Sequence, residues 1–252
     1  MKHLLYIARF CIIPALGFGF CLFGTNLQAG QPFQYSVENN EITITGCPGK
    51  VTELLIPEKI DGMPVTKIGS GAFYRRPDLK SVSIPKGIKA IESRAFMHCF
   101  GLVRISLSEG LETIGEAAFE FYSPLPSVKI PASVRQIEGV PFNGCRALKA
   151  IEVSSENQYF SSKDGVLFDK QQTAIIKYPQ GKPTSSFLLS SSVVEVQPLA
   201  LAGCIQLKAI ITAEDNPIFS SSRGVLLSKD GKTLLQYPGG LSGPAVIPQN
   251  VT

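Results

Sequence analysis

The residues with the greatest capacity for chemistry are six cysteines and two histidines. His98 and Cys99 are neighbours, and a thiol beside an imidazole is the pair from which cysteine nucleophiles are built. On an extended chain, however, adjacent side chains point in opposite directions, so this pair is not expected to form a dyad. His3 lies in a segment that we expect to be removed, which leaves His98 as the single histidine available to a hydrolase. The sequence therefore predicts a protein that is not an enzyme, with a secreted enzyme as a distant alternative.

The cysteines that follow Ala29 predict buried thiols rather than disulfides. Cys99, Cys145 and Cys204 share one position of a sequence repeat, so all three are expected to point into the core. Cys99 and Cys145 are two repeats apart, which at ~4.8 Å per strand places them about 10 Å from one another. That separation exceeds the roughly 7 Å between Cα atoms that a disulfide can bridge. Cys47, near the N-terminal end of the repeats, is expected to remain unpaired.

No metal, cofactor or phosphate site is predicted. The sequence has no Cys-x-x-Cys, no His-x-x-x-His and no cluster of carboxylates with metal-ligand spacing. Asp164-Gly165 and Asp230-Gly231 could be calcium-binding turns, but Asp-Gly is also a preferred dipeptide of tight hairpins. No glycine-rich phosphate loop precedes a helix.

Composition excludes two further classes. Hydrophobic residues make up 44% of the 252 residues and charged residues 17%, which is too apolar for a disordered chain. Leaving out Lys2 and Arg9, which lie in the segment expected to be removed, 22 basic residues face 20 acidic ones. This near-balance, without basic runs, predicts no nucleic-acid partner.

Residues 1–29 are typical of a secretory signal. Lys2 and Arg9 precede an apolar run over residues 10–24 that Pro14 interrupts, and cleavage is expected near Ala29. An uncleaved anchor is the alternative, although a membrane-spanning helix needs ~20 apolar residues. No second apolar stretch follows, so no membrane span is predicted in the mature chain.

The elements that would position any site repeat every 23 residues over residues 51–153. Seven apolar registers recur together, and such coincidence is the signature of a repeat fold. Four of these registers are Phe73, Phe96, Phe119 and Phe142; Ile68, Ile91, Ile114 and Ile137; Val65, Ile88, Leu111 and Val134; and Val82, Ile105, Val128 and Ile151.

One unit contains one strand and a short return. Residues 79–84 alternate apolar and polar side chains, which predicts a half-buried strand that Pro85 ends. The return through Ile88, Ile91 and Phe96 predicts a short extended or 3₁₀ segment rather than a long helix. A unit of this size cannot enclose its own apolar side chains, so stacked units must share one continuous core.

The pattern Leu-x-x-Val-x-Ile-Pro over residues 79–85, continued to Ala95, Phe96 and Cys99, resembles the BspA-type leucine-rich repeat of bacterial surface proteins. Residues 56–65 resemble the extra loop of a first repeat. The resemblance extends from about Gln34 to the C-terminus. It implies an α/β-type repeat solenoid, a right-handed leucine-rich repeat with short parallel strands on a concave face.

The flanking regions have other periods. Residues 33–45 predict a β-hairpin that turns at Asn39-Asn40 and lies in an N-terminal cap over residues 30–50. In residues 154–252 a second, longer period appears, in which Asn157 recurs as Asn216; we call it the long period. Each copy predicts an inserted hairpin of two strands. Ile247-Pro248 opens a further unit, so the chain is expected to end within a repeat and to be a fragment of a longer protein.

The strand positions between the buried ones form the candidate binding surface. We expect them to face outward on the concave side of the strands, where repeat proteins bind partners. They predict an exported, non-catalytic adhesion or interaction module that binds an extracellular or cell-surface protein. The alternatives are a structural spacer or envelope scaffold, or binding by the convex edge or by the hairpin tips, such as Phe219 and residues 220–222. The predicted contact residues are Ser81, Ser83, Arg104, Ser106, Ser127, Lys129 and Glu152.

Overall fold

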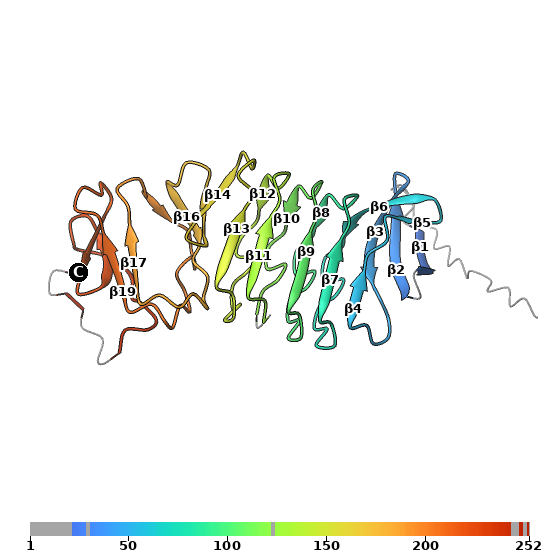
Figure 1. Cartoon of the computed structure of the whole chain (residues 1–252), viewed down its shortest axis with the longest axis horizontal. Helices are drawn as coiled ribbons and strands as arrows, with labels where there is room; N and C mark the ends of the chain where they lie inside the picture. The colour runs from blue at the N-terminus through green and yellow to red at the C-terminus, as the bar shows by residue number, and fades with distance from the viewer. Residues whose placement is uncertain (1–21, 29–30, 122–123, 243–246, 249–250, 252) are drawn as a thin grey trace, which may run out of the picture.

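The computed structural model describes residues 22–252 apart from 29–30, 122–123, 243–246, 249–250 and 252, and shows an elongated stack of short strands (Figure 1). All regular elements in these residues are β-strands. The predicted solenoid with parallel strands is confirmed, whereas its α/β class is wrong. The chain is a β-solenoid over the described residues because each return segment consists of a short strand and turns rather than a helix.

One ladder of strands contains the predicted strand of each unit, and we call its outward surface the long-strand face. β4, β7 and β9 pair in parallel, as do β11 with β13 and β17 with β19. These strands are β4 (Glu53–Leu55), β7 (Ser81–Ile84), β9 (Arg104–Leu107), β11 (Ser127–Ile130), β13 (Ala150–Val153), β17 (Ser186–Leu189) and β19 (Ala209–Thr212).

A second ladder contains the return segments. Its parallel strands are β3 (Glu41–Gly46), β6 (Met63–Ile68), β8 (Ala90–Ile91), β10 (Thr113–Ile114) and β12 (Gln136–Ile137), and further along the chain β16 (Ala174–Lys177) pairs with β18 (Glu195–Val196). The expected short extended return is therefore present in each regular unit.

Left-handed residues explain why the return is not helical. Arg75, His98, Phe121 and Gly144 occupy the same position in successive units and have φ between 56° and 75°. Each would end an α-helix, because L-residues adopt this conformation singly. The amides of Arg75, His98 and Phe121 bond to the next unit instead, as where His98 N donates to Glu120 O at 3.0 Å. The turns thus form a further ladder of hydrogen bonds along the stack.

A break in the long-strand ladder falls at Pro126. Equivalent residues donate to the preceding unit: Lys80 N to Thr52 O at 2.7 Å, and Val103 N to Lys80 O at 2.9 Å. Proline has no N–H to donate. β9 and β11 accordingly belong to separate sheets.

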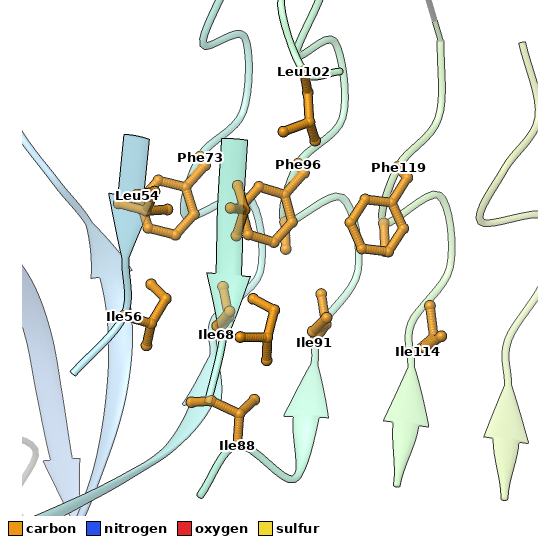
Figure 2. Packing of buried hydrophobic residues seen from close by; sticks show 14 of the residues in the cluster. Leu54, Ile56, Ile68, Phe73, Ile88, Ile91, Phe96, Leu102, Ile114 and Phe119 are labelled. Atoms are coloured by element: carbon orange, nitrogen blue, oxygen red, sulfur yellow. The ribbon is translucent and has the colours of Figure 1, made fainter. Parts of the chain in front are cut away.

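The core runs along the stack between the two ladders (Figure 2). Phe73, Phe96, Phe119 and Phe142 stack face to face, with ring centroids 5.1 to 5.6 Å apart. Isoleucines from β6, β8 and β10 line the same interior. Each unit therefore buries its apolar side chains against its neighbours, as the 23-residue registers predict.

The N-terminal end is a β-hairpin. β2 (Gln31–Glu38) pairs antiparallel with β3, and the turn residues Asn39 and Asn40 have φ of 52° and 61°. β1 (Leu22–Gln28) pairs with β2, and β5 (Lys59–Ile60) pairs with β6 in the extra loop of the first unit. β1 lies within the predicted signal, of which residues 1–21 fall outside the described ones, so cleavage there stays a prediction.

Two antiparallel meanders carry the long period. The first is β14 (Phe160–Lys163), β15 (Val166–Asp169) and β16; the second is β20 (Phe219–Ser222), β21 (Val225–Ser228) and β22 (Leu234–Gln236). The predicted strand pair is present in each copy, and a third strand precedes it. Asp164-Gly165 and Asp230-Gly231 are tight turns, with the Asp230 carboxylate accepting from Ser228 Oγ and Lys232 N.

Candidate binding face

The seven predicted contact residues lie on the long-strand face. Their neighbours Val82, Val128 and Ile151 point inward and are buried, because side chains alternate along a strand. Strand register brings together Ser81 with Arg104, Ser83 with Ser106, and Lys129 with Glu152; Ser127 faces Ala150. The break at Pro126 divides them into one group on β7 and β9 and another on β11 and β13.

The charged residues of this face form two exposed ion pairs. Arg104 lies 3.7 Å from Glu53, and Lys129 lies 3.9 Å from Glu152. The side chains of Arg104 and Lys129 are 73% and 86% exposed. Exposed pairs of this kind contribute about 0–1 kcal/mol to stability, so these charges remain open to a partner.

Glu53 is a member of this face that sequence reasoning missed. β4 pairs with β7 in a register that places Glu53 opposite Ser81. The sequence spacing of this pair exceeds the regular step because the first unit carries an extra loop, so the repeat period does not reveal Glu53. The extra loop was the sequence signal from which the shifted position of Glu53 could have been inferred.

Two shallow hollows lie over the two groups of contact residues. One, of about 450 Å³, lies over β4, β7 and β9 and is lined in part by Glu53, Ser81 and Arg104. The other, of about 410 Å³, is lined in part by Lys129 and Glu152. The surface is therefore open and mixed in charge.

Toward its C-terminal end the long-strand face becomes apolar. Leu188 on β17 and Ile211 on β19 are paired in register and are 62% and 47% exposed. Leu188 occupies the strand position of Ser83. Sequence reasoning missed both residues because the inserted meander hides their register from the 23-residue step.

The residues with nucleophilic potential are structural. Cys99 Sγ donates to Phe73 O at 3.2 Å, and burial raises the pKa of the Cys99 thiol to about 12. The His98 ring instead packs on Tyr74, Phe100 and Phe121. The imidazole and the thiol thus have different neighbours, and the thiol stays protonated at neutral pH.

All the cysteines in the described residues are buried and none of them forms a disulfide, namely Cys47, Cys99, Cys145 and Cys204. Cys145 repeats the bond of Cys99, with its Sγ 3.1 Å from Phe119 O. Burial raises the pKa of Cys204 to about 11. These thiols belong to the packing of the stack.

The alternative surface at the second meander loses its apolar residue, because Phe219 is buried. Phe219 is 6% exposed, and Ser220 Oγ donates to Ser228 O at 2.6 Å. Ser221 Oγ accepts from Thr212 N at 3.1 Å. Phe219 is therefore not available to a partner, whereas residues 220–222 are half-buried and stay a predicted alternative.

Over the described ranges, no group of three or more His, Cys, Asp or Glu side chains is placed to hold a metal ion. The same residues contain no helix with the length and apolarity needed to cross a bilayer.

Comparison with known proteins agrees with this repeat architecture. The family model of the BspA type leucine rich repeat region matches six copies over residues 47–171. The pneumococcal vaccine antigen PcpA is 24% identical with a TM-score of 0.51, covering 76% of this chain and 65% of that one. A leucine-rich repeat protein from Eubacterium ventriosum is 19% identical with a TM-score of 0.52, covering 78% and 62%.

At these identities the two solved structures share the fold with this chain. The chain spans slightly less than two thirds of the length of each. No curated protein sequence matches the chain. Through the repeats of residues 47–171, the chain belongs to the BspA-type leucine-rich repeat family.

Proposed function

We propose that this protein is an exported, non-catalytic interaction or adhesion module that binds an extracellular or cell-surface protein through its long-strand face. The contact surface comprises Ser81, Ser83, Arg104, Ser106, Ser127, Lys129 and Glu152, joined by Glu53. The observation that carries the proposal is the row of exposed charged and hydroxyl side chains that the parallel strands hold in register.

The shape of the surface supports a macromolecular partner. Small-molecule sites are usually concave and mostly apolar, and they enclose most of the ligand. The hollows over Arg104 and Lys129 are shallow and lined by charged and hydroxyl groups as well as apolar ones. A protein surface with complementary charges can cover several strands at once. Export is supported by the predicted signal in residues 1–29.

The proposal is tested by binding of the purified chain to an array of extracellular-matrix and cell-surface proteins and glycans. We expect saturable binding to a protein partner. Arg104→Glu combined with Lys129→Glu should weaken it at least tenfold by reversing both exposed positive charges of the face. Lys86→Glu with Lys232→Glu makes the same charge change at exposed positions elsewhere and should leave the affinity unchanged.

Two results would count against this function. Equal loss of binding in both double variants would show that net charge alone drives association. Absence of any binding across the array would favour a spacer or scaffold that displays another domain.

A further inference from the structure

The long-strand ladder leaves one edge of β17 open. Ser185 O accepts from Lys208 N at 2.7 Å, and Leu189 O accepts from Ala213 N at 2.8 Å. Backbone groups alternate in direction along a strand, so those of Ser186 and Leu188 point away from β19. Among the described residues β17 pairs with β19 alone. The N–H and C=O groups of Ser186 and Leu188 therefore face outward in the plane of the sheet.

The first meander keeps β13 from covering this edge. The Asp164-Gly165 turn between β14 and β15 packs against β13, where Ile151 N donates to Gly165 O at 2.8 Å. A Cβ on Gly165 would lie 2.9 Å from the Cβ of Ala150, so the approach requires glycine as well as its φ of 76°. The hairpin thus occupies the edge of β13 that would otherwise pair with β17.

A cleft lies between this hairpin and β17. Its volume is about 560 Å³, and it is bordered by Val166 and Phe168 of β15 and by Phe187 and Leu188 of β17. This volume exceeds that of the hollows over β7 and β11. The cleft therefore joins an open strand edge to apolar side chains.

The rim of the cleft carries a net positive charge. Lys163 and Lys182 line it together with Asp164. Lys182 Nζ donates to the backbone carbonyl of Asp164, which holds its ammonium at the rim, and Lys163 is exposed. An acidic group of a ligand would be favoured beside these two lysines.

We propose that β17 binds an extended segment of a partner protein by strand addition. The segment pairs with the outward backbone groups of Ser186 and Leu188, inserts an apolar side chain into the cleft and places an acidic residue by Lys163 and Lys182. Open edges are templates for added strands, and strand addition is an established mode of peptide recognition. The inference rests on the proposed binding function but assigns a separate site and the chemistry of its ligand.

The test uses a random dodecapeptide display library panned on the purified chain. Peptides that combine alternating apolar residues with Asp or Glu should be enriched, and the most enriched one is synthesised as the probe. Ser186→Pro removes one outward N–H and leaves the hydrogen bonds to β19 in place. It should lower the affinity for the probe at least tenfold. Ser186→Ala keeps that N–H and should bind like the wild type.

A charge variant and hydrogen exchange provide readouts that do not depend on the proline. Lys163→Glu should lower the affinity for the probe several-fold, whereas Lys232→Glu on the second meander should leave it unchanged. In the wild type, the Ser186 and Leu188 amides should exchange fast when free and at least tenfold more slowly with the probe bound. The amides of Phe187 and Leu189, which face β19, should be protected in both states.

The proposal is overturned if no such peptide is enriched, or if the probe leaves the Ser186 and Leu188 amides exchanging at their free rates. Arg104→Glu with Lys129→Glu should bind the probe normally. Strand addition would be rejected if that double variant lost probe binding while the folded Ser186→Pro variant kept it. The long-strand face would then be the binding site.

Discussion

Two buried asparagines fix the entries to the meanders. Asn157 and Asn216 are fully buried, and each makes four hydrogen bonds to backbone groups. Asn157 Nδ2 donates to Pro131 O and Val134 O at 2.8 Å, which ties the meander to the preceding unit. The long period therefore repeats both the strands of the meander and the buried asparagine that bonds each meander to the preceding unit.

Asn157→Ala should lower the free energy of unfolding by about 2–4 kcal/mol, because buried backbone groups lose their partners. Asn157→Asp should also destabilise the chain, since a carboxylate cannot donate to the two carbonyls. Urea unfolding of both variants measures this, with exposed Gln158→Ala as the control. Unchanged stability in Asn157→Ala would mean that water replaces the amide.

Lys177 is another buried polar residue, at 3% exposure, and its Nζ donates to Leu199 O at 3.0 Å. Burial lowers its pKa from the ordinary value of 10.5. The folded state therefore penalises the charged form, and the penalty fades as the pH rises toward 10.5. The second meander has Gln236 at the equivalent position.

Lys177→Gln should stabilise the chain at pH 7 and flatten the rise of stability with pH in the alkaline range. Guanidinium unfolding midpoints from pH 7 to 10 measure both effects. A pH slope identical to that of the wild type would show that Lys177 keeps its ordinary pKa in the folded state.

At the scale of elements, the stacked phenylalanines join successive units. Phe96 is 1% exposed and its ring lies between those of Phe73 and Phe119 (Figure 2). Removing it takes away contacts with both neighbouring units. The stack therefore links the stability of each unit to that of the next.

Phe96→Ala should lower the free energy of unfolding by about 3–5 kcal/mol through lost burial and the cavity left behind. Phe100, in the same unit, is 48% exposed, so Phe100→Ala should change stability by less than about 1 kcal/mol. Chemical denaturation compares the two. Equal effects would contradict a core that runs through the phenylalanine stack.

The N-terminal end is held to the first unit by an ion pair. Arg76 bonds to Asp78 at 2.8 and 3.0 Å and also to Gly49 O, while Asp78 accepts from Val51 N at 2.8 Å. The hydrogen bond from Arg76 holds the pKa of Asp78 well below 3.8. Asp78 thus contributes stability above that pH, which is lost as the pH falls below it.

Asp78→Asn should destabilise the chain at pH 7 by about 2 kcal/mol, because it removes charge-assisted hydrogen bonds. Below pH 3.8 the difference from wild type should shrink, since protonation makes the wild type resemble the variant. Hydrogen exchange at the Val51 amide measures the local effect. A difference that stays constant down to pH 2 would exclude the ion pair as its origin.

Most of the repeat architecture could be predicted from sequence because each unit packs on copies of itself. A register such as Phe73, Phe96 and Phe119 therefore reports an inward position directly. The left-handed returns could not be predicted, because Arg75 and Phe121 are not residues that favour positive φ. In the candidate site, Glu53 and Leu188 escaped detection because an extra loop and an inserted meander shift their register.

At the scale of the whole molecule, the solenoid presents one surface whose character changes along its length. Exposed charged and hydroxyl side chains lie on β4 to β13, with one exposed apolar residue, Leu55, on β4, whereas exposed apolar side chains lie on β17 and β19. The core follows the same division, with one cluster reaching Ile176 and a second from Val166 to Leu226. The proposed binding face and the open edge of β17 therefore lie on different stretches of the stack.

The most direct test of the binding face is the acetylation rate of Lys129 in the presence of a saturating protein partner. Lys129 is 86% exposed in the free chain, so a small acylating reagent should modify it quickly. We predict at least tenfold protection of Lys129 in the complex, with Lys86 and Lys232 modified at their free rates. Acetylation of Lys129 at its free rate in the saturated complex would contradict binding through the long-strand face.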